Sequence, residues 1–388
     1  MKRDGLDISV LNATRLNAML LNYGRLNTSI GDRVTGGLTP SPGIKGPVAS
    51  YRCYDKTNDD EDRDVLKDLS GNGHDIQLYN FAFSRGSGYG KYAVDDFNSK
   101  WSVYGMQSYD KGKYHITFKE RDAANTDLFI YSQNGTSNLP AGSYHFTGFK
   151  YRITNPGNHT IKAIFRGDES LYSEYVSAGG VYTFPSIDLE VVEDGTKNYG
   201  FQLSCTTLQS DDLGVTFEII PDYRGALVSD GVDDYGSCEN FPILTEEKGY
   251  TVVAIRKWIN DTQPRCLLST HDGASYGAFQ MEKYNDIGFC CLNFGASTGM
   301  QSFSPNDIVY QISLSYNGNI ELAKGSSDGT SVLNLFRYMA NQEYGSAALY
   351  ALEIYDRDLT DGEIAKVKER MIAEYEEKTS NTYEEETA

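Results

Sequence analysis

Between residues 113 and 222 the sequence alternates short apolar segments with tight-turn residues. Segments such as KYHITFKE, HTIKAIFRG, YGFQLSC and GVTFEIIPD place apolar side chains at about every second position, the period of a strand with one buried face. The phrases NGTSNLPAG, NPGN and AGG, rich in turn-forming residues, separate such segments. The 29 Tyr and 38 Gly, against 10 Pro, suit many short strands joined by tight turns. The sequence therefore predicts an all-β protein.

Length and charge limit the number of domains and the kinds of binding partner. A chain of 388 residues exceeds an average domain and suggests two or three. Its 35 basic and 54 acidic residues give a net charge of −19, which argues against a nucleic-acid partner because phosphate contacts need clustered Lys and Arg. Residues 1–47 differ, with six basic and three acidic residues. This excess indicates either a weakly basic arm ahead of an acidic body or scattered solvated charges.

A Leu-Asn pair recurs every five residues in LNATRLNAMLLNYGRLN, residues 11–27. Five residues turn a helix through about 500°, which scatters the leucines, and an odd period puts successive leucines on opposite faces of a strand. We therefore expect an extended arm that docks on a repeating partner or winds with its own copies into a trimeric stem. The predicted anchoring residues are Leu11, Asn12, Leu16, Asn17, Leu21, Asn22, Leu26 and Asn27.

The N-terminal residues lack the apolar run of a signal peptide, because charged and polar side chains interrupt MKRDGLDISVLNATRL. No segment reaches the length of a membrane span. We therefore expect the protein to be made and kept in the cytoplasm, without membrane insertion. The six cysteines show no CxxC spacing and are expected to be reduced core residues.

Four phrases in the remaining sequence carry a family resemblance. They are DLSGNGHDIQLYN at 68–80, ALVSDGVDDYGSC at 226–238, YTVVAIRKW at 250–258 and ALYALEIYDRDLTDGEIAKV at 348–367. Their order resembles that of the laminin-G-like, concanavalin A-like lectin jelly roll, although Ser229 stands where that family usually has an aromatic residue. The resemblance implies a jelly-roll sandwich over residues 48–84 and 223–378, after an arm and linker at 1–47.

About 140 residues separate the first two of these phrases, and residues 85–222 are therefore expected to form an inserted domain. Its strand-like segments predict a second β-sandwich, and phrases such as LPAGSYHFTGFKYRIT resemble jelly-roll carbohydrate-binding modules. After the last phrase, Thr360 and Glu363 form a capping box ahead of a helical apolar pattern. This short C-terminal helix is expected to pack on the jelly roll, with a coiled-coil stem as the alternative, before an acidic tail at 379–388.

The sequence shows no arrangement of residues typical of a catalytic site. Glycoside hydrolysis needs two carboxylates across a sugar. Asp188 and Glu190 in IDLEVVED would share a strand face, but Glu193 would lie on the other. No metal-protease, nucleophile-elbow or phosphate-loop motif occurs. We therefore predict that the protein is not an enzyme and requires no cofactor.

Two kinds of binding site remain as hypotheses. The laminin-G-like resemblance implies Ca²⁺ held between loops by acidic oxygens, for which Asp230, Asp233 and Asp234 are the candidates, with 59–62 (DDED) as a second acidic loop. Turn formation with solvated acids is the competing interpretation. Sugar binding needs an exposed aromatic face, for which the loop-like contexts of Trp101, Tyr104 and Tyr276 are candidates, although core packing is the competing role.

An anchoring arm followed by two nested sandwiches resembles the layout of bacteriophage fibre and head-decoration proteins. The resemblance implies a structural virion protein, present as a homo-oligomer, that binds other virion proteins through its arm and displays lectin-like domains to host-surface glycans or to further fibre subunits. The alternatives are an exported bacterial surface lectin and a divergent glycoside hydrolase.

Overall fold

The computed structural model describes residues 44–95, 97, 101–122, 128–132, 139–192, 197–205, 214–242, 250–259, 265–270, 279–284, 287–292, 309–314, 330–339, 342–357 and 359–380. The chain divides into two compact units, residues 1–39 and residues 40–388, and all described residues belong to the second. The Leu-Asn repeats at 11–27 and the tail from 381 onward therefore lie outside the described residues.

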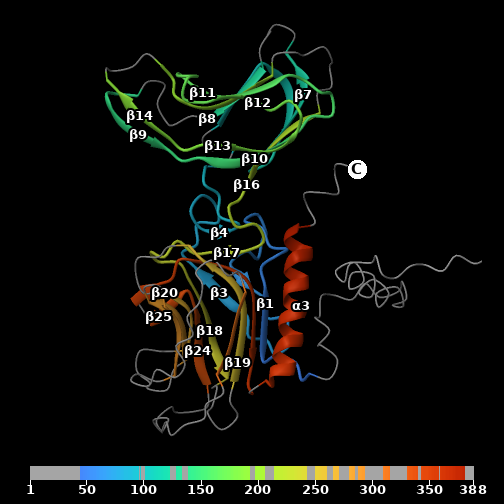
Figure 1. The fold of residues 1–388 in the computed structure, drawn as a ribbon, viewed down its shortest axis with the longest axis vertical. Helices are drawn as coiled ribbons and strands as arrows, with labels where there is room; N and C mark the ends of the chain where they lie inside the picture. The colour runs from blue at the N-terminus through green and yellow to red at the C-terminus, as the bar shows by residue number, and fades with distance from the viewer. Residues whose placement is uncertain are drawn as a thin grey trace, which may run out of the picture. The chain divides into compact units, whose positions relative to one another are not determined.

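Strands dominate the described residues of the chain, and the ladders between the named strands are antiparallel (Figure 1). The segments that the sequence marks as alternating form strands, and the one described helix lies at the C-terminal end. The prediction of an all-β sandwich protein with a C-terminal helix is therefore confirmed.

The strands before residue 90 and after residue 226 form two sheets, which we call the split sandwich. Among the described residues, the first sheet has the order β23-β19-β27-β17-β4, with β1 also paired to β27, and its strands are β1 (Ala49–Arg52), β4 (Gly88–Tyr89), β17 (Leu227–Val228), β19 (Tyr250–Trp258), β23 (Val309–Leu314) and β27 (Ala347–Tyr355). The second has the order β2-β3-β18-β24-β20-β21-β22, and its strands are β2 (Val65–Leu66), β3 (Ile76–Tyr79), β18 (Tyr235–Pro242), β20 (Arg265–Ser269), β21 (Phe279–Tyr284), β22 (Ile287–Leu292) and β24 (Thr330–Leu335). A hairpin of β25 (Arg337–Met339) and β26 (Gln342–Tyr344) follows β24.

Strand β27 is the centre of the split sandwich, because all nine of its residues are buried. Leu349, Leu352 and Ile354 belong to the core that also contains residues of the second sheet, such as Leu335. Other side chains of the strand, including Tyr350, belong to a separate core shared with the helix. A strand covered on both faces reads as a continuous apolar run, which explains the sequence ALYALEIY.

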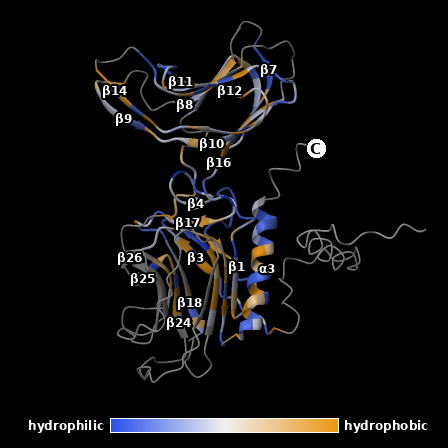
Figure 2. Cartoon of the chain, in the orientation of Figure 1, coloured by the Kyte–Doolittle hydropathy of each residue, from blue (hydrophilic) through white to orange (hydrophobic). Residues whose placement is uncertain are grey.

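Helix α3 (Asp361–Ser380) covers the outer face of the first sheet (Figure 2). The predicted capping box is present, with the Thr360 amide 2.9 Å from Glu363 Oε2 and the Glu363 amide 3.3 Å from Thr360 Oγ1. Ile364, Val367 and Met371 are buried in the core with Tyr350. The apolar face is thus used within the chain, so the coiled-coil alternative was wrong. No helix in the described part of the chain is long and apolar enough to cross a membrane.

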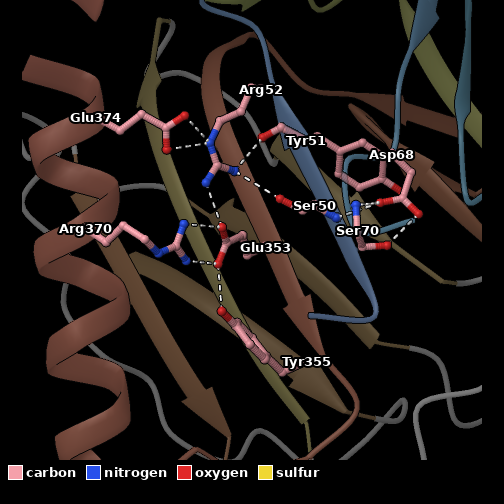
Figure 3. A network of polar contacts seen from close by, with 9 residues as sticks. All are labelled: Ser50, Tyr51, Arg52, Asp68, Ser70, Glu353, Tyr355, Arg370 and Glu374. Carbon is pink, nitrogen blue, oxygen red and sulfur yellow. Dashed lines mark hydrogen bonds and ion pairs between the residues drawn. The ribbon is translucent and has the colours of Figure 1, made fainter. Parts of the chain in front are cut away.

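A buried ionic network ties α3 to strands β1 and β27 (Figure 3). Arg370 of the helix donates to both carboxylate oxygens of Glu353, at 2.9 and 2.6 Å. Arg52 of β1 bridges Glu353 at 2.6 Å and Glu374 of the helix at 2.9 Å. The hydroxyl of Tyr355 donates to Glu353 at 2.7 Å. The Glu353 and Arg52 side chains are 1% and 7% exposed, and the Arg370 side chain is 23% exposed. The Glu353 carboxylate is therefore buried and is paired with two arginines.

The DLSGNG phrase forms a turn organised by one carboxylate. Asp68 accepts hydrogen bonds from the backbone amides of Ser50 and Ser70, at 3.0 and 2.9 Å, and from the Ser70 hydroxyl at 2.8 Å (Figure 3). The His74 amide also donates to Asp68, at 3.0 Å. Gly71 and Gly73 adopt φ of 86° and 81°, a region that favours glycine. These requirements explain the residue types and their spacing in the phrase.

Strands β5 to β16 pair only with one another in the described residues and form what we call the inserted sandwich. One sheet has the order β13-β10-β16-β7-β6, with β6 (Met106–Lys111), β7 (His115–Arg121), β10 (Phe149–Thr154), β13 (Gly180–Phe184) and β16 (Val215–Ile220). The other, which we call the β8 sheet, has the order β12-β11-β15-β8-β5, with β5 (Trp101–Tyr104), β8 (Leu128–Ser132), β11 (Ile161–Arg166), β12 (Ser173–Tyr175) and β15 (Gly200–Cys205). Strands β9 (Gly142–Phe146) and β14 (Ile187–Val191) make a separate pair.

The inserted sandwich has its own aromatic core. Phe217 is fully buried, with ring centroids of Phe97, Tyr151 and Trp101 at 5.4, 5.3 and 5.8 Å. The chain enters and leaves this core through two hydrogen-bonded segments, in which the amides of Asp222 and Tyr223 donate to the carbonyls of Lys91 and Gly90 at 3.0 and 2.9 Å.

Candidate functional site

The turn between β17 and β18 brings together the three acidic residues that the sequence predicts as metal ligands. Carboxylate oxygens of Asp230, Asp233 and Asp234 all lie within 4.8 Å of one another. Gly231, at φ 79°, allows the sharp turn that folds these side chains together. The Asp230 amide donates to Asp234 Oδ2 at 2.8 Å, and the Val232 amide donates to Asp230 Oδ1 at 2.7 Å. These bonds fix the positions of two of the three carboxylates.

Asp234 is the buried member of this cluster. Its side chain has no exposed surface, and its Oδ1 atom has no hydrogen-bond partner among the described residues. Burial raises the pKa of Asp234 to about 7, against the hydrogen bond from the Asp230 amide, and the nearby charge of Asp230 raises it further. An ionised Asp234 would therefore favour a nearby positive charge.

The second acidic loop, residues 59–62, uses two of its carboxylates locally. Asp60 accepts from the amide and hydroxyl of Thr57 at 3.1 and 2.7 Å, as in a turn. Asp62 forms an ion pair with Lys56 at 2.6 Å, which lowers the pKa of Asp62. In this loop the acidic residues therefore form turns and surface ion pairs, which was the alternative to metal binding.

The predicted sugar-binding aromatics occupy different environments. Trp101 is only 7% exposed, and its indole nitrogen donates to the Asp95 carbonyl at 3.0 Å. The prediction of an exposed platform is therefore wrong for Trp101, because its ring packs against Phe97 and Phe149 in the aromatic core. Tyr104 is 48% exposed. Tyr276 lies outside the described residues.

Tyr104 begins an aromatic row on the outer face of the β8 sheet. Its ring stacks on Phe129 at 4.7 Å between centroids, with 18° between planes, and Phe129 lies 5.7 Å from Tyr131. The guanidinium carbon of Arg166 lies 4.3 Å from the Tyr131 ring centroid. The strand register places Gln202 opposite Tyr131 and Ser204 opposite Phe129. We call this set of residues the aromatic face.

The sequence motif considered for glycoside hydrolysis lies on β14. Asp188 and Glu190 share the exposed face of the strand, as expected, and each is paired across to β9. Asp188 Oδ1 lies 2.6 Å from Nδ1 of His145, and Glu190 accepts a hydrogen bond from the Ser143 hydroxyl. Both carboxylates thus belong to cross-strand pairs on an exposed surface.

Comparisons with known proteins leave the family open. No family model matches the chain, and no curated protein matches it. A solved structure of a protein from Parabacteroides distasonis is 10% identical, with 80% of this chain and 98% of that one covered, at a TM-score of 0.14. At this level of similarity, the neighbouring structure supports no conclusion about fold or function.

Proposed function

We propose that this protein is a non-enzymatic, glycan-binding structural protein of a virion, of the bacteriophage fibre or head-decoration type. In this proposal the split sandwich is a laminin-G-like jelly roll, and the inserted sandwich is a carbohydrate-binding module. The arm at residues 1–47 anchors the protein to other virion proteins. The observation that carries the glycan-binding part is the aromatic face of the β8 sheet.

The chemistry of this face suits a sugar ring. Aromatic rings such as Phe129 and Tyr131 offer apolar surface to the C–H groups of a pyranose, and polar groups around them fix its orientation. Leu128 and Ile130, the neighbours of Phe129 and Tyr131 in the strand, are buried in the core. The strand therefore turns its aromatic side chains to the outer face.

Arg166 adds a second feature that supports ligand binding. It makes cation–π contacts with Phe129 and Tyr131, and no ion pair to it occurs in the part of the chain that the structure describes. A guanidinium held against an aromatic ring presents donors beside an apolar surface, which matches a glycan with hydroxyl or carboxylate groups.

We expect Phe129→Ala to reduce glycan retention by about tenfold, because it removes the ring between Tyr104 and Tyr131. The measurement is a glycan array with the wild-type protein, followed by titration of the best ligand. Tyr109→Ala is the control, because Tyr109 is 41% exposed on β6 of the other sheet. Equal loss in both variants, or no retained glycan with the wild type, would contradict the assignment.

The virion part of the proposal rests on the Leu-Asn repeats and is tested separately. A full-length variant with Leu11, Leu16, Leu21 and Leu26 all changed to Ser should lose binding to purified virions. Burial of each leucine side chain against the partner would stabilise the complex by about 1.5–3 kcal/mol when the side chain is fully covered. Co-sedimentation with particles is the measurement. If the variant and the wild type both fail to bind particles while both retain glycans, the exported surface lectin takes the place of the virion protein.

A further inference from the structure

We infer that the ligand of the aromatic face is an acidic polysaccharide, held through the carboxylate groups of its uronic acid units. This inference rests on the proposed glycan-binding function and adds to it the charge and the length of the ligand. Two observations carry it. One is a guanidinium on this face that has no counter-ion among the described residues, and the other is a row of side chains that crosses the whole β8 sheet.

Arg166 reaches the aromatic rings from a strand that is not adjacent to theirs. It lies on β11, and its partner in the ladder is Gly200 of β15, the strand between β11 and β8. Because Gly200 has no side chain, the Arg166 side chain can cross β15. Its guanidinium carbon lies 4.3 Å from the ring centroid of Tyr131 and 5.9 Å from that of Phe129. The guanidinium group is therefore held beside the rings before any ligand binds.

The guanidinium group of Arg166 has donors available for a carboxylate. Its Nη1 atom is buried and has no hydrogen-bond partner among the described residues. Within the described ranges, no hydrogen bond or ion pair to Nε or Nη2 occurs either, and these two atoms are not buried. Nε and Nη2 form one edge of the planar group, which can donate two parallel hydrogen bonds to the two oxygens of a carboxylate. A neutral sugar hydroxyl offers a single oxygen, so a carboxylate matches this edge better.

The charge of this face differs from that of the chain as a whole, which is −19. On the described strands of the β8 sheet, the side chains that share a face with Phe129 include Lys162 and Arg166 and no Asp or Glu. Glu174 of β12 lies opposite the buried Ala163 and therefore has the other orientation. An anionic ligand would thus meet positive charge on this face, although the protein is acidic.

Two other basic residues of the inserted sandwich show what Arg166 lacks. Lys162 forms an ion pair with Glu169 of the following turn at 2.6 Å. On the other sheet, Arg152 faces Glu218 across the ladder between β10 and β16, at 3.4 Å. Arg166 has no such partner in the part of the chain that the structure describes, so a ligand carboxylate would be its counter-ion. The attraction would be screened less beside the rings than in open water.

A row of side chains crosses all five strands of the β8 sheet and gives the length of the ligand. In register order the row contains Tyr104, Phe129, Ser204, Lys162 and Tyr175. Tyr104 and Tyr175 lie on the two edge strands of the sheet and are 48% and 68% exposed. Four strand spacings separate them, or about 19 Å. A surface of this length with an aromatic ring at each end suits several sugar units of a chain better than one terminal sugar.

The test compares acidic polysaccharides with their methyl esters, in which the same sugars carry no charge. The probes are polygalacturonate, alginate and hyaluronate, each beside its methyl ester, and their binding to the full-length protein is measured by biolayer interferometry. The wild type should bind at least one acidic polymer about tenfold more tightly than its ester, because only the acid can accept both donors as an ion. Raising the salt concentration should weaken binding of the acid more than binding of the ester.

Three variants assign this preference to one side chain. Arg166→Gln should lower the affinity for the acidic polymer about tenfold and leave the affinity for the ester within about twofold. Arg166→Lys, which keeps the charge but loses the planar pair of donors, should retain part of the preference. Lys150→Gln is the matched control, because it removes one positive charge from an exposed position on β10 of the other sheet, and it should change neither affinity. Thermal unfolding of each variant checks that the inserted sandwich is folded.

The outcomes separate this inference from the proposed function. Equal binding of acid and ester by the wild type would overturn the inference and leave glycan binding in place. Retention of neutral glycans on the array without binding of any acidic polymer would do the same. Equal weakening by Arg166→Gln and Lys150→Gln would also overturn it, because the polymer would then respond only to net charge. If the wild type retains no glycan of either kind, the proposed function fails and this inference fails with it.

Discussion

Glu353→Gln is expected to lower the free energy of unfolding of the split sandwich by about 3–5 kcal/mol. The substitution keeps the shape of the side chain but removes the charge that faces Arg52 and Arg370. Glu374 remains as a counter-ion for Arg52, while Arg370 loses its partner in the network. The amide introduced at position 353 would be neutral, so the buried ion pairs that Arg52 and Arg370 form with this side chain would both be lost. Chemical denaturation followed by far-UV circular dichroism measures the change.

The stabilising contribution of Glu353 depends on pH through the pKa of its carboxyl group. Burial alone would raise the pKa of Glu353, but hydrogen bonds and charges from Arg370 and Arg52 outweigh it and lower the pKa from 4.5 to about 2. A carboxyl with a depressed pKa in the folded state stabilises that state above its unfolded pKa. The contribution is therefore present above about pH 4.5 and is lost as the pH falls towards 2. Glu353→Gln should remove this part of the acid sensitivity.

Asp356→Asn is the matched control for Glu353→Gln. Asp356 forms an ion pair with Lys45 at 3.6 Å, and its side chain is 36% exposed. Such surface pairs contribute about 0–1 kcal/mol, so the control should change stability little. A similar loss in both variants would show that the buried network does not anchor α3 in the way its geometry indicates.

Phe217→Ala is expected to destabilise the inserted sandwich by about 3–5 kcal/mol. The ring is fully buried and lies within 6 Å of three aromatic rings, so its removal leaves a cavity that rigid neighbours cannot fill. Val181→Ala, at a 51% exposed position on β13, should shift stability by less than about 0.5 kcal/mol.

Differential scanning calorimetry of both variants tests whether the two sandwiches unfold separately. Their hydrophobic cores share no residue among those described. We therefore expect two thermal transitions, of which Phe217→Ala lowers one and Glu353→Gln the other. A single transition that both substitutions lower equally would mean that the two cores unfold as one cooperative unit.

The sequence predicted strands and the helix well where periodicity was strong. The capping box at Thr360 and Glu363 and the apolar spacing of Ile364, Val367 and Met371 appear in α3 as expected. The ionic network was not predicted, because Arg52 and Glu353 are about 300 residues apart and no local pattern shows that they meet. Within strand β27 a lone Glu reads as a solvent-facing residue, although this one is buried between a sheet and a helix.

For the candidate sites, too, the sequence predicted groupings of residues that are close in the chain and missed features that depend on the tertiary structure. The three acids lie within five residues of one another, so the sequence could group them, and the structure places their oxygens together. Of the aromatic face only Tyr104 was predicted from the sequence. Its other rings were missed because Leu128, Phe129, Ile130 and Tyr131 are all apolar, and alternation cannot then tell which pair faces outwards. Trp101 was misassigned because residues 98–100 (NSK) suggested a loop, whereas its ring completes the aromatic core.

The hydrogen-bonded segments at Gly90 and Tyr223 also bear on the order of events during synthesis. Strand β1 pairs with β27 through contacts such as Ala49 to Ile354, so the first of the described strands must wait for nearly the whole chain. The inserted sandwich is complete by Ile220 and can fold while the rest is still being translated. Once folded, it brings Lys91 beside Asp222, which replaces a flexible loop of about 130 residues with a short bridge. Each halving of the loop length lowers the entropic cost of loop closure by roughly 0.6 kcal/mol. An insert that folds early would therefore lower the entropic cost of pairing the strands on either side of it and speed assembly of the interrupted sheet.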